Sequence, residues 1–320
     1  MAALGAAFAG SGRADAGMTL TADGIVQGFS LSTFADNFPS TSNIGPVGIG
    51  FAPGGNVLVT DYGSAAGTMY NFATDTDGQH AGPGLATATY GANNPTGIAT
   101  LDGNLYMALQ GSGAVYQINN DGTFRQVIAT GIPTATDIVA DPATGKLYVS
   151  ALGSGIYVID TTNKNQVSRL STISTDGMSL SADGKTLYVA NGGNLLAVST
   201  ATGLQTQYLG FISGLDGTAL GTGTLAGNIF ANTNGGSVVE VSLNTLNQTV
   251  IASGGSRGDL VKVDPHNGTL LLTQSDSILR LSPPTGGGFG NPAPEPSTLI
   301  LAAVGGLTGL GARWRRRRPA

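Results

Sequence analysis

A unit of about forty residues recurs six times along this chain of 320 residues, and it constrains the fold more than any other feature. Each unit opens with a short strand, and the openings lie at Gly48, Gly97, Asp137, Gly177, Gly217 and Asp259. A polar turn follows, as in Asp141–Gly145, and then an apolar strand such as Leu147–Ser150. Strands with regular turn signals also occur in β-sandwiches, but the same four-strand order in every unit predicts propeller blades around a channel.

The sixth unit lacks a fourth strand, because it stops at Ser282-Pro283-Pro284. A spare strand, Gly28–Phe34, precedes the first unit. Placing it as the outer strand of the sixth blade closes the ring and leaves no open edge between the first and last blades. The sequence therefore predicts an all-β, six-bladed β-propeller of four-stranded blades over residues 17–284. The 51 glycines and the charged fraction of only 10% fit short strands joined by tight turns.

One blade carries a motif that is found in several propeller families. Residues 181–191 read Ser-Ala-Asp-Gly-Lys-Thr-Leu-Tyr-Val-Ala-Asn and resemble the blade motif of YVTN, NHL and SMP-30/gluconolactonase-like propellers. The resemblance spans roughly residues 28–284 as a fold. These are turn and strand residues common to many propellers, so the motif implies a fold and no particular activity.

The C-terminal residues 294–320 contain three ordered elements. Pro294-Glu295-Pro296 precedes an apolar run, Leu299–Ala312, and the chain ends in an arginine cluster made of Arg313, Arg315, Arg316, Arg317 and Arg318. An ordinary membrane anchor is the alternative, but the run is shorter than the roughly 20 residues of a comfortable span. The order resembles the PEP-CTERM sorting signal of Gram-negative bacteria. That resemblance implies an exosortase as processing partner, and the family accompanies exopolysaccharide and biofilm production.

The N-terminal residues and the segment that precedes the sorting signal complete the expected domain organisation. Residues 1–16 are expected to be the remnant of a signal peptide, with a cleavage site at Ala14-Asp15-Ala16. Its basic region is missing, so either the true start lies upstream or the segment is a chance Ala-rich leader. Residues 285–293 are expected to be a Gly/Pro linker. We expect export, transient anchoring in the inner membrane through a helix of the tag alone, and a final location at the cell surface or outside the cell.

Charge and cysteine content exclude several classes of function. The formal net charge of −5 becomes −9 without the tag and residues 1–16, since 8 basic residues then face 17 acidic ones. Such a body has too few cations to neutralise phosphates, which excludes nucleic acid as a partner. The chain has no Cys, which removes disulfides, thiolate catalysis and Cys-based metal sites.

The residue just before each innermost strand is expected at the channel mouth. Aligning the six units places there Val47, Thr96, Thr136, Asp176, Asp216 and Asp259. Hard oxygen ligands converging from separate loops suit Ca²⁺, so we expect a calcium site formed by Asp176, Asp216 and Asp259 with Thr136. Two alternatives remain open: these Asp residues cap strand ends and turns, or they hold a catalytic metal.

The family resemblance speaks for and against a catalytic metal. In SMP-30-like lactonases the metal is held at this position by Asn and Asp, and Asp176-Gly177 and Asp216-Gly217 look similar. That family also uses a Glu entering the first blade, where this chain has Val47. The departure weakens a lactonase interpretation.

Polar side chains are also expected on the loops between the second and third strands, on the same face as the mouth. We predict a ligand rim from Asp61, Tyr62, Asn191 and Asn232. Amides and an aromatic ring there would hydrogen-bond sugar hydroxyls, although Asn and Asp are also ordinary turn residues.

These observations favour a non-enzymatic, exported propeller that acts as a binding or interaction module at the cell surface. Its expected ligand is a polysaccharide or another surface component, together with the calcium ion at the mouth. The alternative is a metal-dependent SMP-30-like lactonase or other hydrolase, or a lyase, that uses the mouth aspartates. An enzyme needs a positioned proton acceptor, and the sequence offers none beyond these carboxylates.

Overall fold

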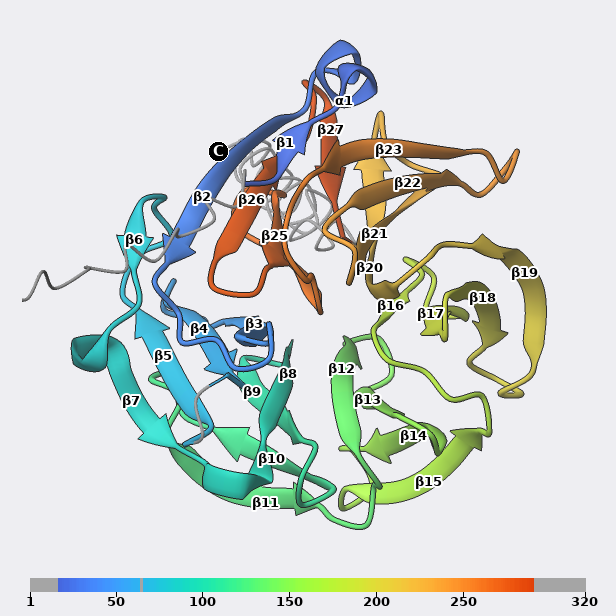
Figure 1. The fold of residues 1–320 in the computed structure, drawn as a ribbon. Helices are drawn as coiled ribbons and strands as arrows, with labels where there is room; N and C mark the ends of the chain where they lie inside the picture. The colour runs from blue at the N-terminus through green and yellow to red at the C-terminus, as the bar shows by residue number, and fades with distance from the viewer. Residues whose placement is uncertain (1–16, 64–65, 291–320) are drawn as a thin grey trace, which may run out of the picture. The chain divides into compact units, whose positions relative to one another are not determined.

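The computed structural model describes residues 17–63 and 66–290, which form six sheets arranged as blades around a central channel (Figure 1). From the channel outward, blade one consists of β3 (Pro46–Phe51), β4 (Val57–Asp61), β5 (Thr68–Phe72) and β7 (Ala86–Thr89). Blade two consists of β8 (Pro95–Leu101), β9 (Asn104–Leu109), β10 (Ala114–Ile118) and β11 (Phe124–Ala129). Blade three consists of β12 (Ala135–Asp141), β13 (Lys146–Ala151), β14 (Gly155–Asp160) and β15 (Gln166–Ser171).

The remaining blades follow the same order. Blade four consists of β16 (Met178–Leu180), β17 (Thr186–Asn191), β18 (Asn194–Ser199) and β19 (Gln205–Phe211). Blade five consists of β20 (Leu215–Gly223), β21 (Asn228–Thr233), β22 (Val238–Ser242) and β23 (Gln248–Ser253). Blade six consists of β24 (Val261–Val263), β25 (Leu270–Thr273), β26 (Ile278–Ser282) and β2 (Ser30–Asp36). The predicted six-bladed propeller is confirmed.

The ring is closed by the N-terminal strand, as predicted. β2 pairs antiparallel with β26, with Ser30 opposite Ser282 and Thr33 opposite Leu279. A fifth strand, β6 (Gln79–His80), comes from the long insertion of blade one and pairs parallel with β2. Blade six is therefore completed by β2 from the N-terminal part of the chain and by β6 from the insertion of blade one, which leaves no open edge at the join.

One buried arginine ties the insertion of blade one to blade six. Arg280 of β26 is 6% exposed, and it lies among three carboxylates. Its Nε donates to Asp77 at 2.7 Å, its Nη2 to Asp75 at 2.5 Å and its Nη1 to Asp264 at 3.1 Å. Asp75 and Asp77 of the insertion thus neutralise a buried cation at the closure of the ring.

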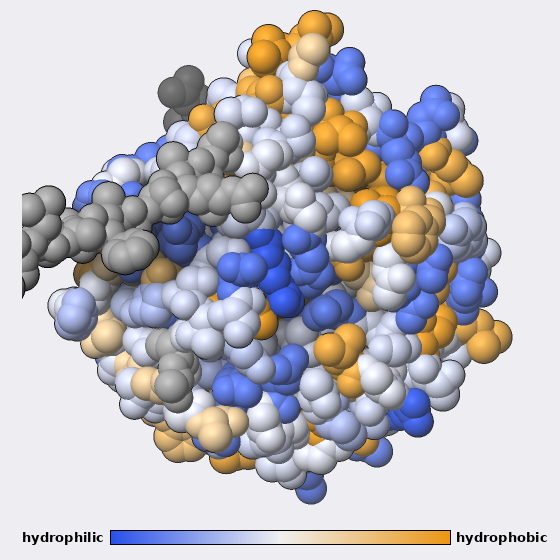
Figure 2. All heavy atoms as spheres, viewed as in Figure 1, coloured by the Kyte–Doolittle hydropathy of each residue, from blue (hydrophilic) through white to orange (hydrophobic). Residues whose placement is uncertain are grey.

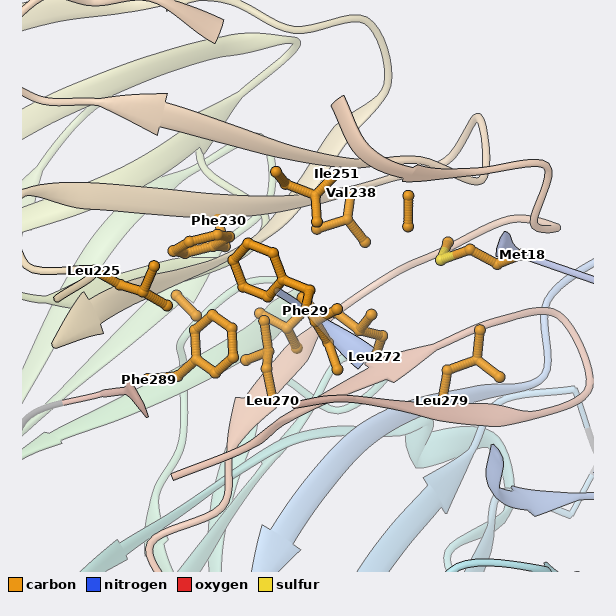
Figure 3. Close-up of a cluster of buried hydrophobic side chains, with 14 residues drawn as sticks. Met18, Phe29, Leu225, Phe230, Val238, Ile251, Leu270, Leu272, Leu279 and Phe289 are labelled. Carbon is orange, nitrogen blue, oxygen red and sulfur yellow. The ribbon is translucent and has the colours of Figure 1, made fainter. Parts of the chain in front are cut away.

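Both ends of the described chain lie in the interface between blades five and six. β1 (Thr19–Leu20) pairs with β23, α1 (Ala22–Gln27) follows it, and β27 (Gly287–Phe289) pairs antiparallel with the end of β20. Phe289 packs edge-on against Phe230 with ring centroids 4.9 Å apart, and Phe29 lies 5.7 Å from Phe230 (Figure 3). The segment 285–293, expected to be a linker, therefore begins as a strand with a buried aromatic anchor.

Two expected segments lie outside the described residues. These are the signal-peptide remnant at 1–16 and the sorting signal at 294–320. Among the residues that are described, no helix has the length and apolar character needed to cross a membrane. The helical segments described are α1 and two short 3₁₀ helices, η1 (Pro83–Leu85) and η2 (Gly91–Asn93).

The hydrophobic core is divided among the six interfaces between adjacent blades. Each interface has its own cluster of buried side chains, for example Met107 and Leu58 between blades one and two. The cluster between blades five and six includes Phe230, Leu270 and Leu272 together with the end residues Met18 and Phe289 (Figure 3). Because the sheets pack face to face around a ring, the stability of each blade depends on its two neighbours.

Neighbouring blades approach closely at the start of their innermost strands. A β-carbon added at Gly48 would lie 1.9 Å from the carbonyl oxygen of Thr96, and one at Gly177 would lie 2.4 Å from that of Asp216. A β-carbon at Gly97 or at Gly217 would also lie too close, at 2.7 Å from Asp137 and from Val261 of the following blades. None of the four has a positive φ, so glycine is needed there for space between backbones rather than for its conformation.

We expect the substitution Gly177→Ala to lower the free energy of unfolding by about 1–3 kcal/mol, because the added methyl group overlaps the backbone of blade five. Gly84→Ala is the matched control, since Gly84 is exposed and a β-carbon there has no neighbour within 4 Å. Urea unfolding followed by circular dichroism would measure both. Equal stability of the two variants would contradict the close-approach argument.

Candidate functional site

The six predicted mouth positions line one cavity of about 120 Å³ at the end of the channel. The strand register explains why they converge. Ile49, Ile138 and Met178 pair with equivalent second-strand residues of their blades, so the residue two positions earlier reaches the mouth each time. Hydrophilic residues gather at the centre of the face seen in Figure 2, with hydrophobic ones beside them. The other lining residues are Ile44, Tyr62, Gln110, Leu152, Arg257 and Leu260.

The three mouth aspartates interact strongly with one another. Burial raises the pKa of Asp216 well above its usual range, and the charges of Asp176 and Asp259 add to the effect. Burial also raises the pKa of Asp176 to about 7, again with a contribution from Asp259. The pKa of Asp259 is raised by burial, although hydrogen bonds from Arg257 and Asp216 oppose the shift. The cluster therefore retains protons near neutral pH.

Arg257 supplies the positive charge of the cavity. Its Nη2 and Nε donate to the same oxygen of Asp259, at 2.7 and 3.1 Å. The residue lies in the loop Gly254–Gly258, just before the innermost strand of blade six. Strand periodicity does not place a side chain that lies two residues before a mouth position. Arg257 was therefore not predicted from the sequence.

The donor set does not fit a calcium ion in this arrangement. Asp259 is paired with Arg257, and Asp216 accepts a hydrogen bond of 3.0 Å from Asn234. The Thr136 hydroxyl donates to the carbonyl of Thr134 at 2.9 Å. Within residues 17–63 and 66–290, no three or more His, Cys, Asp or Glu side chains are grouped to hold a metal ion. Ca²⁺ takes six to eight oxygen ligands, so these oxygens would have to exchange their present partners for the ion, and the calcium site stays a prediction.

A second pair of charges spans the channel further along the innermost strands. Lys262 of blade six donates to the carbonyl of Ile138 in blade three at 3.2 Å. Asp137 accepts from the backbone N–H groups of Ile138 and Met178 at 2.8 and 3.0 Å. Burial raises the pKa of Asp137 and Lys262 opposes this shift, while burial lowers the pKa of Lys262. These polar contacts join opposite blades across the lumen.

Two of the four predicted rim residues point into the protein. Asp61 and Asn232 are both 0% exposed. Asp61 accepts from the N–H of Gly63 at 2.7 Å, and Asn232 donates to the carbonyls of Asp259 and Thr273 at 3.2 and 3.1 Å. They tie backbone segments together instead of facing solvent, because their side chains lie on the strand face that packs against neighbouring strands.

The other two rim residues remain accessible. Tyr62 lines the mouth cavity, and its hydroxyl accepts from Asn94 at 3.5 Å. Asn191 is partly exposed and donates to the carbonyl of Ser174 at 2.5 Å. The structure therefore assembles the mouth residues into one cavity but does not assemble the four rim residues into one surface.

Residues 292–318 match the PEP-CTERM protein-sorting motif, so the chain carries the sorting signal that its sequence suggested. This motif marks an exosortase-processed surface protein that is exported and anchored in the membrane before cleavage in Gram-negative bacteria. The sequence matches no curated protein.

The propeller is similar to several solved structures. A gluconolactonase from Xanthomonas campestris has 13% identity and a TM-score of 0.62, and the match covers 84% of this chain and 95% of that one. A catalytically inactive virginiamycin B lyase from Staphylococcus aureus has 13% identity and a TM-score of 0.53, with 79% and 99% covered. A chain of the nidogen/laminin complex has 16% identity and a TM-score of 0.53, with 70% and 93% covered. At these identities the likenesses show the fold alone.

The raised pKa of Asp176 predicts a pH-dependent stability. The folded protein holds a proton on Asp176 up to about pH 7, whereas the unfolded chain releases it near pH 3.8, so the free energy of unfolding falls as pH rises between these values. We expect Asp176→Asn to flatten this slope and to raise stability at pH 8 by about 1–3 kcal/mol. Urea unfolding at pH 5, 6, 7 and 8 would measure it. Parallel pH profiles for both proteins would refute the assignment.

The pairing of Arg257 with Asp259 predicts how the protein responds to calcium. We expect millimolar CaCl₂ to leave the melting temperature of the wild-type protein unchanged. Arg257→Gln frees the Asp259 carboxylate, so calcium should raise the melting temperature of that variant by roughly 2–4 °C. Differential scanning calorimetry would test both proteins. A wild-type shift that Asp216→Ala abolishes would instead establish the calcium site expected from the sequence.

Proposed function

We propose that this exported propeller is a binding module of the cell surface, and that its channel-mouth cavity holds a hydroxyl-rich group of a polysaccharide. The observation that carries the proposal is the state of the mouth carboxyls. Asp259 is paired with Arg257 and Asp216 accepts from Asn234, while burial raises the pKa of Asp216, so the cavity offers fixed hydrogen-bond donors and acceptors. Such groups match the hydroxyl groups of a sugar.

The rest of the cavity supports this ligand class. Gln110, Thr96 and Tyr62 add an amide and two hydroxyls, while Val47 and Leu260 add apolar walls. Apolar walls with a few convergent polar groups are typical of sites for small molecules or for single groups of larger ones. A volume of about 120 Å³ admits one group of a chain rather than a whole oligosaccharide. Export through the sorting motif brings the protein to a surface where polysaccharides are available.

A hydrolase is the second candidate, and one observation favours it. The pKa of Asp176, raised to about 7, is matched to proton transfer at neutral pH. In that function Asp176 would accept a proton from water, and Arg257 would stabilise developing negative charge on a carbonyl oxygen. A lactone is the substrate class to consider, because the fold is shared with a gluconolactonase.

Binding to polysaccharides tests the first candidate. We expect the full chain, purified in mild detergent, to be retarded in affinity electrophoresis by exopolysaccharide from the bacterium that encodes it. Asp216→Ala and Arg257→Ala should each weaken retardation at least tenfold, since each removes part of the paired network of the cavity. Lys185→Ala is the matched control, because the Lys185 side chain is 81% exposed and does not line the cavity.

The same proteins distinguish the two candidates. Hydrolysis of aldonolactones by the wild-type chain that Asp176→Asn abolishes would replace the binding module with an enzyme. Absence of retardation by exopolysaccharide, with the wild-type chain folded by circular dichroism, would contradict the binding proposal.

A further inference from the structure

A groove of about 310 Å³ adjoins the mouth cavity and runs outward over blade four. It shares Leu152 and Asp176 with the cavity, so the two hollows adjoin at these residues. Its other lining residues include Ser174, Gly193, Phe211 and Asn234. The volume reaches the lower end of the range of about 300–1,000 Å³ that is usual for ligand sites. Together the two hollows offer room for more than one unit of a chain-like ligand.

Phe211 forms an apolar surface in this groove. The side chain is 58% exposed at the end of β19, although an aromatic ring of this size is normally buried. It lies against the backbone of Gly193, where an added β-carbon would lie 2.7 Å from Cε2 of the ring. Its own carbonyl accepts from Gln248 at 3.2 Å, which holds the backbone in place. The groove therefore presents a positioned aromatic ring to solvent.

Asp176 is the polar group at the inner end of the groove. Within the described part of the chain its carboxyl makes no side-chain hydrogen bond, unlike Asp216 and Asp259. Burial and the neighbouring carboxylates disfavour its charged form. A cationic group placed in the groove would remove this unfavourable interaction, because it would stabilise the carboxylate.

The charges around the groove select against an acidic ligand. No Lys or Arg is among the residues that line it, and the Arg257 guanidinium of the adjoining cavity is already paired with Asp259. The propeller body carries 8 basic and 17 acidic residues, so its field repels polyanions. Polysaccharides built from uronic acids, or carrying phosphate or sulfate, are therefore poor ligands.

We propose that the groove binds a glycan whose sugars carry free amino groups, with one sugar ring against Phe211 and an ammonium group beside Asp176. The inference rests on the proposed function and specifies its ligand class. An amine accounts for the aromatic surface and also for the Asp176 carboxyl, which makes no side-chain hydrogen bond with any described residue. A neutral sugar would leave that carboxyl uncompensated.

Isothermal titration of the full chain in mild detergent with three tetrasaccharides at pH 7 tests the proposal. The probes are the tetramers of glucosamine, N-acetylglucosamine and galacturonic acid. We expect the glucosamine tetramer to bind at least tenfold more tightly than the other two. Asp176→Asn should remove that preference, and Phe211→Ala should weaken the binding of the glucosamine tetramer about tenfold. Tyr208→Ala is the matched control, because Tyr208 is 50% exposed on the same strand but does not line the groove.

The outcomes separate this inference from the proposed function. Equal affinity for the glucosamine and N-acetylglucosamine tetramers, or tighter binding of galacturonic acid, would overturn the amine inference while exopolysaccharide binding stands. A preference for glucosamine that survives Asp176→Asn would overturn the assignment to this groove, as would equal effects of Phe211→Ala and Tyr208→Ala. Loss of exopolysaccharide retardation in the wild-type chain would instead contradict the proposed function itself.

Discussion

The close approach of neighbouring innermost strands at the channel mouth is the constraint on which the candidate site depends. Gly48, Gly97, Gly177 and Gly217 allow the backbones of adjacent blades to meet where any side chain would overlap the next strand. The residues that precede these glycines are thereby brought from separate blades into one cavity of about 120 Å³. Residues about forty positions apart in sequence thus become direct neighbours, and the composition of the site follows from what each repeat carries at that position.

Three carboxyls at such short range cannot all ionise, and the protein resolves the conflict with protons and an arginine. Burial and the neighbouring charges raise the pKa of Asp216 and raise that of Asp176 to about 7, while Asp259 pairs with Arg257. A metal ion would solve the same electrostatic problem, but the guanidinium already occupies one of the carboxylates. A gluconolactonase and a virginiamycin B lyase have similar folds, so the fold alone does not decide the function, and the site has to.

Those features of the fold and of the candidate site that follow from the repeat could be predicted from the sequence. Those that depend on single side chains could not. The strand count placed the closing strand in blade six, and the alignment of the units placed Asp176, Asp216 and Asp259 in one cavity. Arg257 escaped prediction because it lies in a glycine-rich loop outside the periodic pattern. Asp61 and Asn232 were expected on the rim, but Asp61 ends β4, Asn232 lies one residue before the end of β21, and both side chains are buried. The exposed ring of Phe211 has no sequence signal, since its environment is formed by loops from three blades.

The path of the chain at its C-terminal end bears on how the protein withstands mechanical load. A protein held at a surface by its C-terminus receives a pulling force at Gly290, directly after β27. That strand lies beside β20 and outside the four strands of any blade, while the ring is closed by β2 from the opposite end of the chain. A moderate pulling force would detach the three residues of β27 and withdraw the Phe289 ring before the force reached β26. Under such a load β27 can thus yield before any strand of blade six.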